Sequence, residues 1–282
     1  MSKYPIILLL AMIPCIAAAD GKIYGRNDSI AIERILKKHS AAVYGSKGER
    51  VLAIAEEFIG AAYVGATLEN GKEEPLFVSC SELDCSTFVE LTAAISVTID
   101  GKEHSFDAVC RNLERIRYRG GKRDGYASRL HYTSWWIDDN TEKGLVQEVT
   151  ASTEHRKRRS SLFFMSMNSD KYGMLENDTE MQATIKALEA PYQDIEVKYI
   201  PKEWLDRERS TLKIADGDII ALVTTIDGLD ISHVGFAFWK DGKLHLLHAS
   251  SAEGKVIMDT TTLYDYQKNK RTQIGIRVLR IL

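Results

Sequence analysis

The sequence has no apolar run long enough to cross a membrane and no excess of charge of either sign. Its main apolar stretch, 4–16, is shorter than the roughly 20 residues that a membrane-spanning helix needs. Lys and Arg number 37 and Asp and Glu 40, so the 282-residue chain has a formal net charge of −3. Low-complexity tracts and internal repeats are also absent. We therefore expect an ordinary globular chain with no membrane span and no nucleic-acid partner.

The first 19 residues have the pattern of a secretory signal peptide. Lys3 precedes the apolar stretch, and the small residues 17–19 stand before Asp20 as a cleavage site. Cys15 directly follows a proline, which fits a lipid acceptor poorly, so no lipid anchor is expected. We predict that residues 20–282 form a single domain, a monomer exported to the periplasm.

Cysteine is scarce. Only Cys80, Cys85 and Cys110 remain once the leader is removed. An odd number of cysteines in an exported protein leaves at least one thiol free. Pairing of Cys80 with Cys110 is a hypothesis that the sequence leaves open, because it does not supply their separation.

Cys85 stands at the predicted start of a buried helix. Asp84 is a strong N-cap residue, and apolar positions then recur at helical spacing, at Phe88, Val89, Leu91, Thr92 and Ile95. Backbone N–H groups at a helix N-terminus favour a thiolate and can face a developing oxyanion. Cys85 is therefore a candidate nucleophile. A small buried hydrophobe at a helix start is the alternative that this segment alone leaves open.

A β-hairpin closed on an Asp-Gly turn is predicted over 231–250. If Lys240 pairs with Lys243, Gly235 lies opposite His248. A bulge at the turn would break this register, because a slip of one residue moves every side chain to the other face.

This register gathers two histidines on one face of the hairpin. His233 shares a face with Gly235 because side chains alternate along a strand, and His248 is the diagonal neighbour of His233. The glycine leaves room between the two rings. His245 points to the other face. One thiol and two histidines would supply a nucleophile, a base and a partner that orients the base.

These motifs resemble the NlpC-type superfamily of bacterial cell-wall cysteine peptidases and amidases. The similar segments are Asp84-Cys85-Ser86, Ser232-His233-Val234-Gly235 and His248-Ala249-Ser250. Segment 58–65 is similar to the glycine-X-proline-tyrosine segment of that superfamily, with Ala62 in place of proline. Gly217-Asp218 looks like the Gly-Asp pair that opens the strand before the histidine strand.

The resemblance implies a fold and a set of roles. The implied fold is α+β and papain-like, with the cysteine helix packed on a mostly antiparallel sheet. The implied roles are Cys85 as nucleophile, His233 as base, His248 as the third polar residue and Tyr63 near the oxyanion.

The string 129–138 combines Arg, His, Tyr and paired Trp. Such residues supply flat apolar surface and a cation that can grip a carboxylate at two points. Core aromatics and a surface arginine are the competing interpretation. The string also resembles the muramoyl-alanine-amidase-like branch, which carries an Arg-X-His-Tyr motif before a tryptophan. That likeness implies cleavage of a lactyl–peptide bond and substrate contacts from Asp84, Ser86, Arg129, His131, Tyr132, Trp135 and Ser232.

The segment 97–200 is predicted as a long insertion between the cysteine helix and the histidine strands, which indicates a functional elaboration. The basic run 155–159 within it is expected to be a solvated loop. Helices are expected over 27–36, 46–59, 105–116, 177–188, 201–212 and 262–268. Strands are expected over 97–101, 162–167, 218–224, 256–258 and 274–281.

Three functions compete at this stage, none of which needs a cofactor or a metal. The first is an N-acetylmuramoyl-L-alanine amidase acting on peptidoglycan fragments (muropeptides) through a Cys-His-His triad and a thioester. The second is an endopeptidase that cuts within the stem peptide. The third is a non-catalytic cell-wall binding protein, which would not require Cys85, His233 and His248. A zinc site formed by His233, His245 and His248 is a less favoured hypothesis, because His245 points to the other face of the hairpin.

Overall fold

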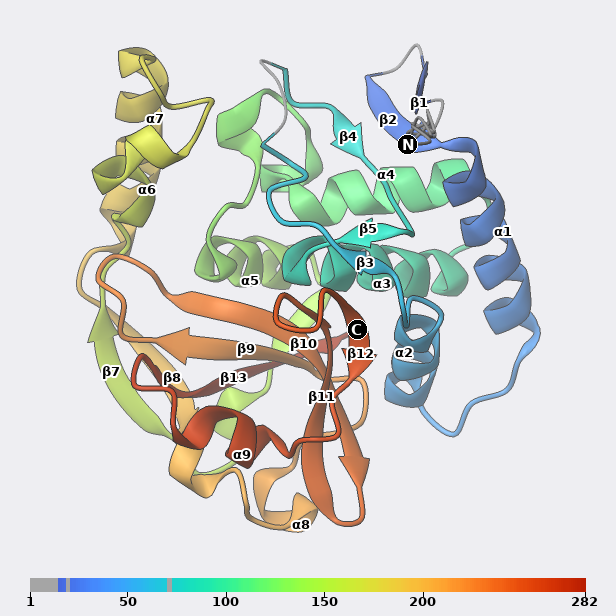
Figure 1. Ribbon diagram of the computed structural model, residues 1–282, viewed down its shortest axis with the longest axis vertical. Helices are drawn as coiled ribbons and strands as arrows, with labels where there is room; N and C mark the ends of the chain where they lie inside the picture. The colour runs from blue at the N-terminus through green and yellow to red at the C-terminus, as the bar shows by residue number, and fades with distance from the viewer. Residues whose placement is uncertain (1–14, 19–20, 70–72) are drawn as a thin grey trace, which may run out of the picture.

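A ten-stranded, mostly antiparallel sheet organises the computed structural model, which describes residues 15–18, 21–69 and 73–282 (Figure 1). The strand order is β5-β3-β12-β11-β10-β9-β13-β8-β7, and β6 also pairs with β13. Among the described strands of this sheet, only β3 and β5 pair in parallel. Its strands are β3 (Ala62–Tyr63), β5 (Glu82–Leu83), β6 (Val146–Glu148), β7 (Arg156–Ser160), β8 (Ile195–Pro201), β9 (Ile219–Thr224), β10 (Ile231–Lys240), β11 (Lys243–Ser250), β12 (Lys255–Met258) and β13 (Gln273–Ile281).

Helices cover both faces of this sheet, which gives the mixed α+β class that the sequence predicts. In Figure 1, α3 and α4 lie above the sheet, and α8 and α9 lie below it. The helices are α1 (Arg26–Ala41), α2 (Lys47–Glu56), α3 (Cys85–Asp100), α4 (Phe106–Arg117), α5 (Thr133–Glu142), α6 (Phe164–Met167), α7 (Thr179–Glu189), α8 (Arg209–Leu212) and α9 (Leu263–Lys268). None of the helices within the described ranges has the length and apolar character that a bilayer span requires.

Helix α3 is the centre of the helical layer. Asp84 caps it, since its Oδ1 accepts hydrogen bonds from the backbone N–H and the hydroxyl of Thr87, each at 2.8 Å. Phe88 packs edge-to-face on Phe58 and on Phe236 of β10, which ties the helix to the sheet. Helices α1 and α2 pack beside α3.

The main sheet has an apolar cluster on each of its two faces. The larger cluster fills the space between one face and α1 to α5 and includes Phe88 and Phe236. The smaller one lies on the other face, where Ala237 and Leu246 meet Leu263 of α9. From Val234 onward, alternation along β10 therefore assigns successive apolar side chains to one cluster and then the other.

The N-terminal segment forms a separate small sheet. Most of the predicted leader lies outside the described residues, but Cys15–Ala18 is a strand, β1, paired antiparallel with β2 (Lys22–Gly25). Strand β4 (Leu76–Phe77) joins β2 in parallel.

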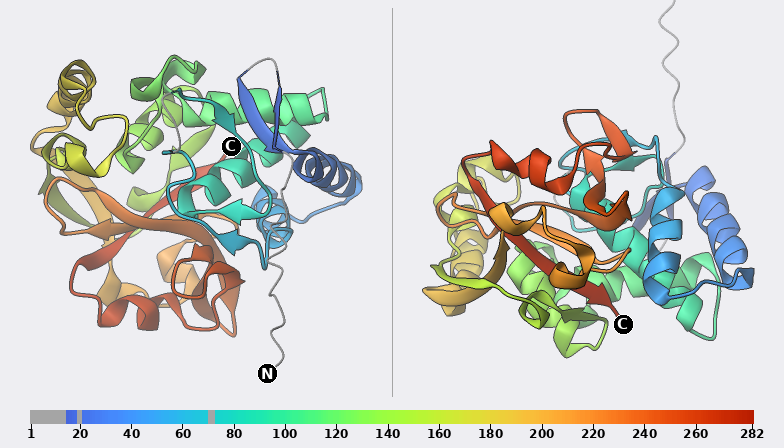
Figure 2. Two further views of the ribbon diagram at one scale, coloured as in Figure 1. Left: turned by 45° about the horizontal axis from the view of Figure 1, so that its top comes forward. Right: turned by 90° about the horizontal axis from the view of Figure 1, so that it is seen from below.

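The segment 97–200 contributes to the main sheet as well as to its surroundings. Strands β6 and β8 both pair with β13, so the segment is woven into the fold. Helices α6 and α7, in yellow, lie at the end of the molecule opposite to α1, in blue (Figures 1 and 2).

Four local predictions are wrong. Residues 97–99 continue α3 instead of forming a strand, 162–167 enters helix α6, and the basic run 155–159 forms most of β7. Pro201 ends β8 instead of starting a helix, and the only α-helix within 201–212 is the short α8. In each case long-range pairing or packing outweighs the local propensity.

Candidate active site

Cys85 is the first residue of α3, at the end of the helix that faces β10. The residue is partly buried, and Ser86 beside it is exposed. The backbone N–H of Val234 and the groups of Ser86 hydrogen-bond the sulfur. Because Val234 directly follows His233 in β10, these contacts bring the thiol to the histidine strand.

The histidine hairpin has the predicted register. Lys240 pairs with Lys243, and the ladder between β10 and β11 runs back to Phe236 opposite Leu247. A Cβ on Gly235 would lie 2.8 Å from the Cβ of His248, which shows how closely the two strands approach there.

A β-bulge at Ser232 sets the direction of the His233 side chain. Ile231 pairs with Val223 of β9 and His233 pairs with Leu222, so Ser232 is the extra residue. Ile231 packs in the larger apolar cluster, and the bulge sends His233 to the other face. Ser232 itself is exposed, with its Oγ 3.4 Å from the carbonyl of Leu222.

His233 and His248 form a close pair. The Nε2 of His233 lies 2.6 Å from the Nδ1 of His248, and the rings meet edge-to-face with centroids 4.8 Å apart. His245 points to the opposite face, where its ring stacks on Phe238. The juxtaposition expected from strand alternation is therefore present.

Burial keeps both reactive groups neutral. Burial, reinforced by the charge of Asp84, raises the pKa of Cys85 to about 11 despite the hydrogen bonds to its sulfur. Burial, reinforced by His248 and Lys270, lowers the pKa of His233 to about 3. The hydrogen bonds to the sulfur favour the thiolate, but burial has the larger and opposite effect on the pKa of Cys85.

Tyr63 and Tyr266 are far apart in the sequence, and both lie near the thiol of Cys85. Burial raises the pKa of each phenol, and the charge of a Cys85 thiolate raises it further. Tyr63 belongs to β3 and is the residue for which the motif resemblance implied a place near the oxyanion. Tyr266 belongs to α9, and nothing in the local sequence pattern predicted it at this site.

A cavity of about 190 Å³ opens beside the N-terminus of α3. Five of the predicted substrate-contacting residues line it: Asp84, Ser86, Arg129, His131 and Tyr132. Trp135 is not among them, because its ring is fully buried against Tyr132 in the core. The Trp135 side chain is therefore a core aromatic, as the competing interpretation held.

Arg129 lines the cavity but is already paired. Its guanidinium lies 2.5 Å from Glu69 and 3.5 Å from Glu74, and it donates to the carbonyl of Leu68 at 2.9 Å. The side chain is almost completely buried. Arg129 therefore holds the 65–69 and 73–76 segments, and a free grip on a substrate carboxylate is excluded while these contacts persist.

His131 and Tyr132 are also fixed by protein groups. The Nε2 of His131 lies 2.8 Å from the carbonyl of Tyr126, and burial, with Arg129 nearby, holds the pKa of His131 well below its ordinary value. The Tyr132 hydroxyl donates to Glu189 of α7 at 2.6 Å and accepts from the backbone of Met165 at 2.8 Å. The motif thus anchors α6 and α7 beside the cavity.

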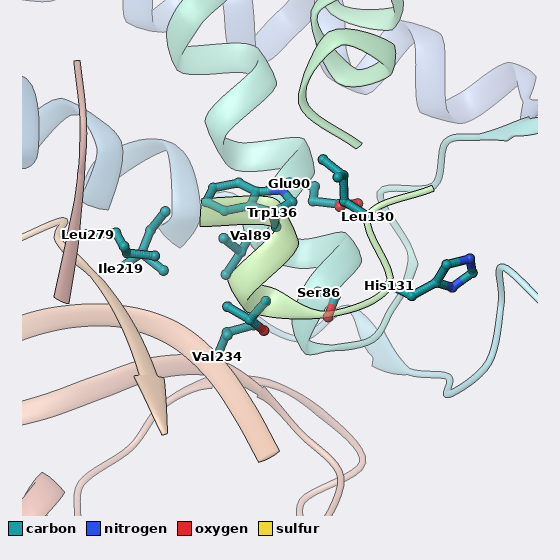
Figure 3. Close-up of a pocket in the computed structure, with 10 residues that line it drawn as sticks. Ser86, Val89, Glu90, Leu130, His131, Trp136, Ile219, Val234 and Leu279 are labelled. Atoms are coloured by element: carbon teal, nitrogen blue, oxygen red, sulfur yellow. The ribbon is translucent and has the colours of Figure 1, made fainter. Parts of the chain in front are cut away.

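A second, smaller cavity adjoins the first under α5 (Figure 3). Figure 3 shows Trp136, Val89 and Val234 around it, with Ser86 and Glu90 at its border. Glu90 borders both cavities and pairs with the buried Arg117, whose Nε lies 2.7 Å from its Oε2. The sequence did not predict this pair. Glu90 is in α3 and Arg117 in α4, and only the packing of the two helices shows which of their sides face each other.

The fold and the site define an α+β protein with a cysteine at a helix N-terminus beside a histidine pair on a hairpin. Comparison with known families then places it more narrowly. The chain belongs to the AmiA-like, N-acetylmuramoyl-L-alanine amidase-like family, whose profile matches residues 53–276. Among curated proteins, no sequence matches the chain.

Solved structures agree with this family. An N-acetylmuramoyl-L-alanine amidase from Bacteroides uniformis is 40% identical with a TM-score of 0.80, covering 84% of this chain and 99% of its own. A Bacteroides fragilis protein, provisionally named a xylanase, is 42% identical with a TM-score of 0.77, covering 81% of this chain and 100% of its own. A Legionella pneumophila protein is 24% identical with a TM-score of 0.65, covers 90% of this chain and 97% of its own, and shows the fold alone.

Proposed function

We propose that this protein is a cysteine amidase of peptidoglycan fragments. It would cut the amide between the lactyl group of N-acetylmuramic acid and the L-alanine of a muropeptide. The observation that carries the proposal is the contact of His233 with His248 at 2.6 Å, beside a cysteine at the start of α3. The amidase-like family and the amidase from B. uniformis support the choice of substrate.

The proposed reaction starts from a neutral thiol and a neutral imidazole. His233 takes the proton of Cys85 as the sulfur attacks the amide carbonyl, and a tetrahedral oxyanion forms. The backbone N–H of Cys85, with the Tyr63 hydroxyl, would stabilise that oxyanion, an effect worth roughly 3–4 kcal/mol per donor. The imidazolium then protonates the leaving amine, and a thioester remains.

Water completes the cycle. Neutral His233 removes a proton from a water molecule, which attacks the thioester carbonyl and releases the carboxylic acid of the lactyl group. Cys85 recovers its proton from the histidine. No step needs a metal or a cofactor.

Fold superfamily and location belong to the same proposal. The motifs that resemble the NlpC-type superfamily support a papain-like relationship in which α3 carries the nucleophile. The leader pattern in the first 19 residues supports export to the periplasm. A muropeptide is a substrate that such a compartment supplies.

The experiment that tests the activity is digestion of defined muropeptides with product masses recorded. Wild-type protein, Cys85→Ala and Cys80→Ala are compared on a sugar-linked stem peptide, the same stem peptide without sugar, and xylan. Cys80 is a matched control, since it is a partly buried free thiol beside the first turn of α1, where its sulfur hydrogen-bonds the carbonyl of Asp28.

The expected result is release of free sugar and an intact stem beginning with L-alanine, lost in Cys85→Ala and retained in Cys80→Ala. Cleavage inside the stem would instead identify an endopeptidase, and cleavage of xylan a glycosidase. Binding without turnover by both wild type and Cys85→Ala would identify a binding protein.

A further inference from the structure

His248 has one ring nitrogen whose partner the proposed reaction does not yet name. Its side chain is fully buried, and its Nδ1 is occupied by His233. Its Nε2 is buried and has no hydrogen-bond partner within the described residues. The carboxylate Oδ2 of Asp259 lies 3.6 Å away, just beyond hydrogen-bond distance.

Asp259 is held so that this oxygen faces the ring. Its other oxygen, Oδ1, accepts from the backbone N–H of Thr261 at 2.8 Å. Its own backbone N–H donates to the carbonyl of Leu246 at 2.9 Å, which ties the segment after β12 to β11. Because the backbone and one oxygen are fixed, the second oxygen is directed at His248.

The remaining side of the ring is covered by α9 and the residues after it. Tyr266 packs edge-to-face on His248 with centroids 5.7 Å apart, and the Lys270 ammonium lies 3.2 Å from the centroid of the Tyr266 ring. The groups that face His248 are therefore His233 from β10, Asp259 after β12, Tyr266 from α9 and Lys270. Of these, only Asp259 is an acceptor placed at Nε2.

We propose that Asp259 is a positioning residue that sets the proton arrangement of both histidines, an inference that rests on the proposed amidase function. A carboxylate accepts but does not donate, so it selects the tautomer of His248 with its proton on Nε2. The Nδ1 of His248 is then an acceptor, and the nitrogen 2.6 Å away, Nε2 of His233, must be the donor. The single lone pair left on His233 is at Nδ1, and that atom is the base for Cys85.

The proton count stays simple during the reaction. The proton of Cys85 moves to Nδ1 of His233, which becomes an imidazolium and keeps its proton on Nε2. His248 remains neutral. The positive charge that develops on His233 would draw His248 toward Asp259 and shorten the 3.6 Å contact.

Asp259→Asn and Asp259→Ala distinguish this role from simple packing. The amide of Asp259→Asn can donate to Nε2 and so favours the opposite tautomer, in which Nδ1 of His248 donates to His233 and the base at Nδ1 of His233 is lost. Asp259→Ala imposes no tautomer. We expect kcat to fall on the order of 100-fold in Asp259→Asn and about tenfold in Asp259→Ala, with KM within about twofold.

Asp265→Asn is the matched control, because it removes the same charge from an exposed aspartate of α9 that pairs with Lys268. It should leave kcat unchanged. A structural role for Asp259 would give the reverse order, with the truncated Asp259→Ala more damaging than the isosteric Asp259→Asn. That order, or equal losses, would overturn the proposal.

A second readout does not depend on turnover. Long-range ¹H–¹⁵N spectra of histidine-labelled protein report which ring nitrogen holds the proton. We expect Nε2 protonation of both His233 and His248 in the wild type and a shift to Nδ1 of His248 in Asp259→Asn. A wild-type His248 protonated on Nδ1 would overturn the assignment of Asp259. Absence of amidase turnover with the expected spectra would instead overturn the proposed function alone.

Discussion

Cys85 and His233 are held neutral by the same cause, their removal from water. The pKa of the thiol is raised to about 11 and that of the imidazole lowered to about 3, so neither ionises near neutral pH. A resting thiolate–imidazolium pair would require the opposite shifts. Burial of the two side chains therefore opposes a resting ion pair between them.

Alkylation of Cys85 tests this resting state. Iodoacetamide reacts with the thiolate, so the rate of Cys85 labelling should rise about tenfold per pH unit from about pH 6 to about pH 10. Labelling is measured by peptide mass spectrometry over a series of pH values. A rate that levels off below about pH 8 would show that an ion pair is already formed.

Arg129 is a buried cation whose removal should destabilise the fold. Its guanidinium is almost fully buried between Glu69 and Glu74. Arg129→Met leaves both carboxylates without their partner, and we expect the free energy of unfolding to fall by about 3 kcal/mol in urea titrations.

The exposed pair of Arg159 with Asp194 supplies the comparison for that variant. Arg159→Met should leave the unfolding midpoint unchanged, since a solvated ion pair contributes little. Unchanged stability of Arg129→Met together with a raised KM would restore the substrate-gripping role predicted from the sequence.

At the scale of elements, the two strands of the β10–β11 hairpin approach each other closely at Gly235. Gly235 faces His248 so closely that an added methyl group would lie 2.8 Å from both the His248 Cβ and the Leu247 carbonyl. Backbone atoms of the two paired strands cannot move apart without breaking the ladder. The space beside Gly235 thus sets the distance between the histidines.

Gly235→Ala should therefore impair both stability and turnover. We expect unfolding free energy to fall by about 1–3 kcal/mol through overpacking, and kcat to fall at least tenfold as the histidine contact lengthens. Gly173→Ala is the control, since nothing lies near the added methyl there, and it should match the wild type. A fully active Gly235→Ala would show that the histidine spacing tolerates movement.

Elements with strong local signals are those that the sequence predicted well. Caps at Ser46, Asp84 and Ser105 start helices α2, α3 and α4, and the Asp-Gly turn gives the hairpin with its register. The strand predicted at residues 97–99 was wrong. Their β-branched side chains favour strands, but these residues continue α3, which packs against α4. The bulge at Ser232 has no local signature, because it arises from pairing with β9.

Site residues divide in the same way. His233 and His248 lie together as strand alternation predicts, and Cys85 contacts Val234, the residue after His233. Asp259 and the partners of Arg129 were not predicted, since their positions follow from contacts between segments far apart in the sequence. Such contacts depend on the whole packed fold, which one sequence does not specify by local rules.

At the scale of the whole molecule, buried neutral histidines make stability depend on pH. The pKa of His233, like those of His131 and His248, is lower in the folded protein than the ordinary value of 6.5. As the pH drops below that value, these histidines therefore take up protons in the unfolded chain but stay neutral in the folded protein. This contribution to stability is complete above it and is lost progressively toward acid.

Removal of one such histidine should weaken the dependence. With its folded pKa near 3, His233 alone accounts for a loss of about 2 kcal/mol between about pH 7 and about pH 5. Urea unfolding at both pH values should show a smaller difference in His233→Gln than in the wild type. His104→Gln, at an exposed histidine, should keep the wild-type difference, and an unchanged difference in His233→Gln would contradict the expectation.

The high pKa of Cys85 also bears on how long the protein survives in an oxidising environment. Peroxides and disulfides attack thiolates, so a sulfur that stays protonated near neutral pH is oxidised slowly. Cys80 and Cys110 share this property, because burial raises the pKa of their thiols to about 12 and about 11. Burial thus protects the free thiols at Cys80, Cys85 and Cys110 from oxidation by the same effect that disfavours their thiolates.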